Sequence, residues 1–76
     1  MKKKISPIHY KLLIRILETF GLKIIRTKGD HIIMAKEGMK RPAVIQAKKS
    51  VSVAHILNNI REANISREEY LKALEG

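Results

Sequence analysis

Three histidines, at positions 9, 31 and 55, are the side chains in this sequence best suited to move protons near neutral pH. His31 differs from the other two because it directly follows the turn-like sequence Lys28-Gly29-Asp30 in a basic stretch. A histidine held there can transfer a proton or contact a phosphate. The alternative interpretation is a strand-end histidine that bonds a backbone carbonyl. His9 and His55 fall in predicted helices and are interpreted as surface or boundary residues.

The remaining residue types exclude several classes of site. Cysteine is absent, no two histidines have helical i, i+3 or i, i+4 spacing, and the four glycines are too dispersed for a phosphate loop. We therefore expect no metal and no cofactor. An enzyme of this composition would perform metal-free acid–base chemistry. RNA cleavage meets that limit because RNA supplies its own nucleophile, the 2′-hydroxyl.

Charge is distributed unevenly along the 76 residues, which carry a net charge of +9. Residues 1–49 hold 13 basic and 3 acidic side chains, whereas residues 50–76 hold 3 basic and 4 acidic ones. This asymmetry favours one surface that faces a polyanion, although genome composition or growth at high temperature could also enrich lysine. A hydrophobic content of 45% indicates a folded domain and not a disordered basic tail.

The N-terminal part of the chain predicts one amphipathic helix. Ser6 is interpreted as its N-cap and Pro7 as its first residue, and Gly21 as the residue that stops it. Apolar residues between these points recur at helical spacing. Residues 1–5 are expected to form a flexible basic arm. Residues 1–4 resemble the basic start of a signal peptide, but polar and charged residues interrupt the stretch that follows, so it is not the apolar region of one.

The middle of the chain predicts three short strands, at residues 22–28, 31–36 and 42–47. Gly29-Asp30 is a two-residue loop of the kind that forms a type II′ hairpin turn. These features predict an antiparallel meander.

Two helices are predicted after the strands. The first spans about 53–63, with Asn64 as a left-handed stop. The second begins with a capping box, Ser66 to Glu69. The sequence therefore predicts a single α+β domain over residues 1–76, with helices on one face of the sheet and the other face left for solvent or ligand. No stretch is long enough to span a membrane, and we expect a cytoplasmic protein.

Two segments resemble the HicA (YcfA-like) family of toxins. Residues 21–31, GLKIIRTKGDH, are similar to the family pattern of Gly, an aromatic residue, three variable residues, Arg, two variable residues and Gly-Ser-His. Residues 60–71, IREANISREEYL, resemble its closing L-R-x-A-G-I-S-x-E-E-F-L. The chain departs from the pattern at Leu22, at Asp30 and after the third strand, where residues 46–50 replace a family Val-Pro-His segment.

The resemblance implies a double-stranded-RNA-binding-domain-like fold and a metal-independent mRNA interferase that a HicB-like antitoxin neutralises. It places the catalytic histidine at His31, the strand arginine at Arg26 and the turn glycine at Gly29. Asp30 in place of serine adds a negative charge beside the catalytic position. The resemblance and the basic residues nearby together predict the residues that contact RNA. These are Arg26, Lys28, Gly29, Lys36, Lys48 and Lys49.

Two other functions fit the same sequence. One is a non-catalytic RNA-binding module of the same fold. The other is an interaction protein that binds an acidic antitoxin and has no role on RNA.

Overall fold

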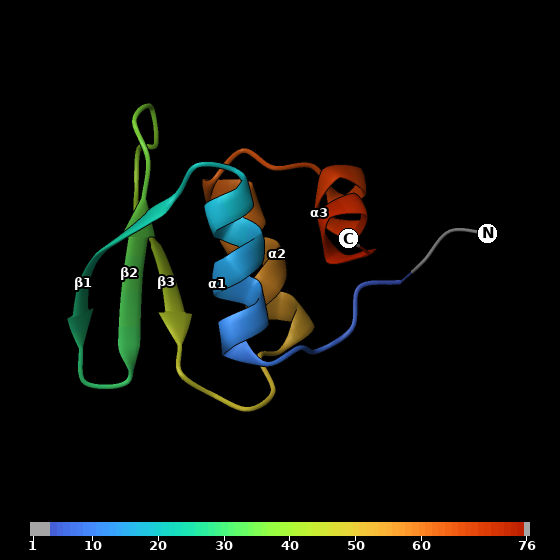
Figure 1. Ribbon diagram of the computed structural model, residues 1–76, viewed down its shortest axis with the longest axis horizontal. Coiled ribbons are helices and arrows are strands. Elements are labelled where there is room, and N and C mark those ends of the chain that lie inside the picture. The colour runs from blue at the N-terminus through green and yellow to red at the C-terminus, as the bar shows by residue number, and fades with distance from the viewer. Residues whose placement is uncertain (1–3, 76) are drawn as a thin grey trace.

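Three antiparallel strands form a sheet in the order β1-β2-β3, and three helices lie to one side of it (Figure 1). The computed structural model describes residues 4–75. The elements are α1 (Tyr10–Thr19), β1 (Lys23–Lys28), β2 (His31–Ala35), β3 (Ala43–Gln46), α2 (Val53–Glu62) and α3 (Arg67–Glu75). The predicted α+β class and element order are confirmed, and the strands end within one residue of their predicted limits.

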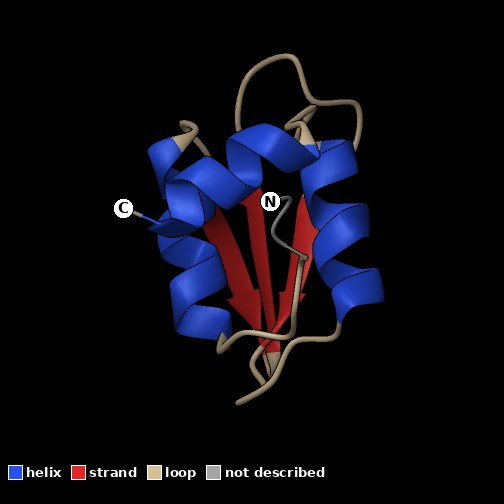
Figure 2. Ribbon diagram, turned by 90° about the vertical axis from the view of Figure 1, so that its right-hand side faces the viewer, coloured by secondary structure: helices blue, strands red, loops and turns tan. Residues whose placement is uncertain are grey.

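The elements form three layers. The α1 and α2 helices lie beside one another over one face of the sheet, and α3 packs on their far side (Figures 1 and 2). The two central helices pack chiefly against β3 and not against β1. This arrangement leaves the opposite face of the sheet uncovered, as the sequence predicted.

The hydrophobic core lies between the sheet and the helices. Leu13 and Leu17 of α1, Ile56 of α2 and Tyr70 of α3 are fully buried. They belong to one cluster with the apolar residues that β2 and β3 direct toward the helices, which are Ile32, Met34, Ala43 and Ile45.

The predicted stop signals of the first two helices are confirmed. Gly21 has a φ of +93°, and its N–H donates to the Glu18 carbonyl, while the Leu22 N–H donates to the Leu17 carbonyl. This pair of bonds is a Schellman motif, which satisfies the last carbonyls of α1. Asn64 ends α2 in the same manner, with a φ of +59°.

The predicted capping box at the start of α3 is also confirmed. The Ser66 N–H donates to Glu69 Oε1 over 3.0 Å, and the Glu69 N–H donates to Ser66 Oγ over 3.1 Å. Two backbone donors at the helix start are thereby satisfied.

The predicted start of the first helix is wrong. Its N-cap is His9, whose Nδ1 accepts from the Lys11 N–H over 3.2 Å. Ser6-Pro7 precedes the helix, because Ile8 forms an antiparallel bridge with Val51 and accepts its N–H over 2.7 Å. Of the predicted N-terminal arm, residues 1–3 lie outside the described residues, Lys4 is exposed, and Ile5 is buried in the core.

The β1–β2 hairpin contains a turn and a bulge. Gly29 has a φ of +56° and Asp30 does not have a positive φ, which is the sign pattern of the predicted type II′ turn. The register shifts between Ile24 and Arg26, so that Ile25 is an extra residue in β1.

Candidate nucleic-acid interface

The uncovered face of the sheet, called the open face below, is defined by alternation along β2 and β3. Residues that alternate with the buried ones point away from the helices. On β2 these are His31, Ile33 and Ala35, and on β3 they are Val44 and Gln46. His31 is exposed, and Val44 is 41% exposed.

Basic residues on β1 share the open face. Lys28 pairs with His31, Arg26 with Ile33 and Lys23 with Ala35. Residues directly opposite one another in an antiparallel pair point to the same side, so all three basic side chains lie on the open face. The bulge at Ile25 produces this result, because Lys23 and Arg26 are three residues apart and would otherwise face opposite sides.

His31 sits in a row of three residues across the sheet, between Lys28 on β1 and Gln46 on β3. Cβ atoms of such direct neighbours are about 5 Å apart, and Arg26 is a diagonal neighbour at about 7–8 Å. A phosphate that reaches His31 therefore meets Lys28 as well. Ile33 and Val44 occupy the next row and give the surface beside the basic residues an aliphatic character.

The segment with Lys48 and Lys49 is joined to the hairpin turn by backbone hydrogen bonds. The Ala47 N–H donates to the Asp30 carbonyl over 2.8 Å, and the Lys48 N–H donates to the Gln46 carbonyl over 2.8 Å. Both lysines are exposed and follow the end of β3 that pairs with His31. Among residues 28–31 and 46–49, Asp30 is the sole acidic residue against three lysines, so this end of the sheet is positive.

Gly29 has a conformational reason to be glycine. Nothing lies within 4 Å of the position that its Cβ would occupy, so space does not restrict the residue. Its φ of +56° does, because L-residues with a side chain rarely adopt this conformation. Gly29 thus sets the turn that positions Lys28 and His31.

Lys36 lies apart from the other predicted RNA contacts. It follows the far end of β2, about 17 Å from His31 at the usual rise of a strand. Its Nζ donates to the Phe20 carbonyl over 3.1 Å, at the C-terminal end of α1. The side chain therefore caps a helix, and the structure does not bring it to the open face.

Sequence reasoning missed two basic residues: Lys23, at the end of the open face away from His31, and Lys11, near the His31 end. Lys23 joins the open face through the bulge, which no sequence signal indicated. Lys11 lies exposed in the first turn of α1, and the adjacent Tyr10 N–H donates to the Lys48 carbonyl over 3.2 Å. That bond places the N-terminus of α1 beside the basic segment, and a helix N-terminus also favours anions.

The other two histidines have local roles. The His9 ring caps α1 and stacks on Tyr10 with 4.9 Å between ring centroids. His55 Nδ1 lies 2.7 Å from Ser52 Oγ, the N-cap of α2. Within residues 4–75 the ring of His31 makes no such bond to another protein group, so both of its nitrogens are available to a ligand.

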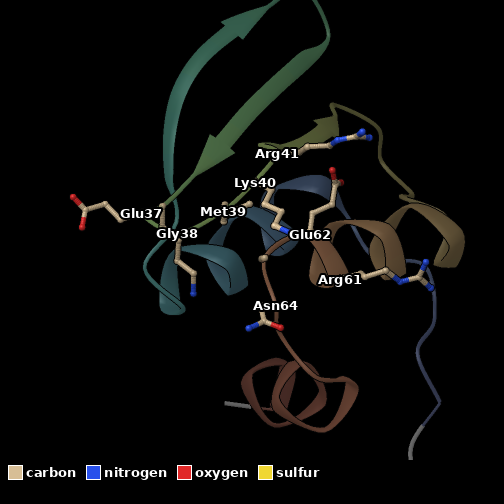
Figure 3. A pocket seen from close by; sticks show the side chains of 10 residues that line it. Glu37, Gly38, Met39, Lys40, Arg41, Arg61, Glu62 and Asn64 are labelled. Carbon is tan, nitrogen blue, oxygen red and sulfur yellow. The ribbon is translucent and has the colours of Figure 1, made fainter.

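A hollow of about 630 Å³ lies elsewhere, between the β2–β3 loop and the end of α2 (Figure 3). Lys40 and Glu62 line its centre, while Glu37 and Arg41 are directed outward. It contains both signs of charge and adjoins the end of β2 opposite His31. It is therefore separate from the open face.

The part of the chain that the structure describes contains no group of three or more histidine, cysteine or acidic residues placed to hold a metal ion. No helix in that part is both long enough and apolar enough to cross a bilayer. Comparison of this chain with protein-family models, with curated proteins and with solved structures found no match.

Proposed function

We propose that this protein binds single-stranded RNA on the open face of its sheet and cleaves it with His31 as the acid–base group. The observation that carries the proposal is the row formed by Lys28, His31 and Gln46, in which an exposed imidazole lies directly opposite a lysine. Arg26 extends the positive charge along β1. Phosphate contacts of this kind supply essentially all of the non-specific affinity of a protein for nucleic acid, and they carry no sequence information.

The reaction needs few protein groups. The 2′-hydroxyl oxygen of one nucleotide attacks the adjacent phosphorus, the bond from phosphorus to the 5′-oxygen breaks, and a 2′,3′-cyclic phosphate forms. Neutral His31 takes the proton of the 2′-hydroxyl, or protonated His31 gives one to the departing 5′-oxygen, and water handles the other transfer. Lys28 and Arg26 stabilise the charge that develops on the phosphate oxygens.

The HicA-like assignment is part of this proposal. It is supported by the two matching segments, by the order of one helix, three antiparallel strands and further helices, and by the position of His31 directly after the turn. We propose on the same grounds a double-stranded-RNA-binding-domain-like fold, a cytoplasmic location and neutralisation by a HicB-like antitoxin. The third layer formed by α3 packs away from the open face and leaves it free.

Product chemistry tests the proposal. The full chain is incubated with a labelled single-stranded RNA in the presence of EDTA, and the ends of the products are identified. We expect 2′,3′-cyclic phosphate and 5′-hydroxyl ends. We expect no cleavage of a deoxy oligonucleotide of the same sequence, which has no 2′-hydroxyl group. Equal cleavage of the deoxy oligonucleotide would contradict the mechanism, because that substrate has no nucleophile.

A non-catalytic RNA-binding module is the second candidate. It is favoured by the absence, within residues 4–75, of any protein group that hydrogen-bonds and orients the His31 ring. Catalytic histidines are commonly held by such a partner. Retarded migration of RNA without cleavage in the same assay would support this alternative over the ribonuclease.

A further inference from the structure

The two outer edges of the sheet differ in how their backbone groups are satisfied. At the β3 edge, the Asn59 side chain of α2 donates its Nδ2–H to the Val44 carbonyl over 3.1 Å. At the other edge, β1 pairs with β2 alone, and no described residue covers its outer side. An uncovered strand edge can pair with a further strand.

Side chains of β1 are also exposed on both of its faces. All six residues of the strand are exposed, because α1 and α2 pack chiefly against β3 and leave β1 outside the helical layer. Ile24 is 47% exposed and Ile25 is 58% exposed, which makes them two of the four most exposed large apolar residues described. An exposed apolar edge of this kind marks a site of association.

The charge of β1 decides between possible partners. Lys23, Arg26 and Lys28 give the strand a charge of +3 with no acidic residue. Pairing with β1 of a second copy would bring the two sets of like charges together, and like charges opposite one another destabilise a strand pair. Lysines and a bulge on an edge are known to hinder self-pairing in this way. A strand that carries acidic residues would gain attraction at the same positions.

We propose that β1 accepts an extended, acidic segment of another protein as a fourth strand of the sheet. The backbone of the partner would pair with the free edge of β1. Its apolar side chains would contact Ile24 and Ile25, and its carboxylates would face Lys23, Arg26 and Lys28. This inference goes beyond the proposed action on RNA, since it concerns a protein strand paired with the free edge of β1. It shares the basic side chains of β1 with the RNA site but does not require cleavage activity.

Thr27 offers a specific way to test edge pairing. Lys28 and His31 close a two-residue hairpin loop and therefore form a hydrogen-bonded pair, so Thr27 and Ile32 form the next, non-hydrogen-bonded pair. The N–H and C=O of Thr27 consequently face the free edge. Thr27→Pro removes an outward donor without removing a bond between β1 and β2, whereas Thr27→Val keeps it.

The probe is a capped peptide in which glutamate alternates with valine, and binding to the full chain is followed by fluorescence anisotropy. We expect the peptide to bind wild type and Thr27→Val equally. We expect Thr27→Pro to bind about tenfold more weakly, since an outward backbone bond is lost and the proline ring obstructs pairing. A control peptide with lysine in place of glutamate should not bind.

Amide hydrogen exchange provides a readout that needs no variant. Saturating peptide should slow exchange of the Thr27 N–H while leaving that of Val44, on the covered edge, unchanged. Unchanged exchange at Thr27, equal binding of the lysine peptide, or concentration-dependent dimers of the chain in place of peptide binding would each overturn the proposal.

RNA binding separates this inference from the proposed function. Thr27→Pro keeps every basic side chain of the open face, so its RNA affinity should equal that of wild type when circular dichroism shows it to be folded. Loss of peptide binding with retained RNA binding supports the edge site. If the protein does not cleave RNA but binds the peptide as expected, the proposed ribonuclease activity is wrong and the edge site is supported.

Discussion

The two faces of the sheet are made from alternating residues of the same strands, yet they have opposite characters. On β3, Ile45 is fully buried against the helices, while its neighbour Val44 is 41% exposed on the open face. On β2, Ile32 and Met34 are buried, while His31 is exposed. Burial of apolar surface stabilises the fold from one side. The other side is consequently free to carry charge and a histidine at little cost in stability.

The largest expected effect is a difference in the free energy of unfolding between a substitution on the buried face and one on the open face. Ile45→Ala should lower the free energy of unfolding by about 2–5 kcal/mol, because it removes buried methyl groups and leaves a cavity. Val44→Ala, one residue earlier and on the open face, should cost about 1 kcal/mol or less. Urea denaturation measures both. Equal losses would show that the open face is packed against something and is not a free surface.

A second test compares the RNA affinity of variants that remove basic side chains from the open face with that of a variant at Lys36. The double variant Arg26→Ala, Lys28→Ala should bind single-stranded RNA about tenfold more weakly at low salt. Its plot of log affinity against log salt should be shallower by about 0.7 for each phosphate that the variant no longer neutralises. Lys36→Ala is the matched control, since this lysine bonds the Phe20 carbonyl and should leave the slope unchanged. A slope that depends on Lys36 as much as on Arg26 and Lys28 would contradict the assignment of the open face.

The smallest expected effects concern the helical side. Ser66→Ala should cost about 1 kcal/mol, the usual value of an N-cap, and should leave RNA binding unchanged. Loss of RNA affinity in this variant at a temperature where it is folded would mean that the two sides are coupled.

The same capping box predicts a pH dependence. The hydrogen bond from the Ser66 N–H, and then the Ser66 side chain, hold the pKa of Glu69 below its ordinary value of 4.5. A carboxyl group with a lowered folded-state pKa stabilises the protein above its unfolded value and loses that contribution as pH falls through the lowered one. The stability advantage of wild type over Glu69→Gln should therefore shrink below pH 4.5, as thermal unfolding at several pH values can show. An advantage that grows in acid would contradict the sign.

Much of the fold could be predicted because its signals are local. Gly21, Asn64, the capping box and the turn at Gly29 each satisfy backbone groups within a few residues, so the sequence around them suffices. The start of α1 could not be predicted in this way. Ser6-Pro7 has the composition of a helix start, but the Ile8 bridge to Val51 uses that segment for pairing with residues distant in sequence.

In the candidate site, too, features set by neighbouring residues could be predicted, and features set by pairing with distant residues could not. The sequence indicated His31, Lys28 and the turn between them, and the register places the first two directly opposite one another. Lys23 was missed because the bulge at Ile25 changes which residues of β1 share a face, and the bulge depends on pairing with β2. Lys36 was included on its charge alone, and only the bond from its Nζ to the Phe20 carbonyl shows that it caps a helix.

Two histidine variants, compared with wild type at equal RNA occupancy, test whether His31 is the acid–base group. Cleavage of a single-stranded RNA is measured under single-turnover conditions for wild type, His31→Ala and His55→Ala, with binding checked by gel retardation. His31→Ala should bind RNA and lose cleavage by a factor of about 10²–10⁴, the usual contribution of a general acid or base. His55→Ala, whose ring bonds the α2 cap, should cleave as wild type does. Undiminished cleavage by a folded, RNA-bound His31→Ala variant would show that His31 is not the acid–base group.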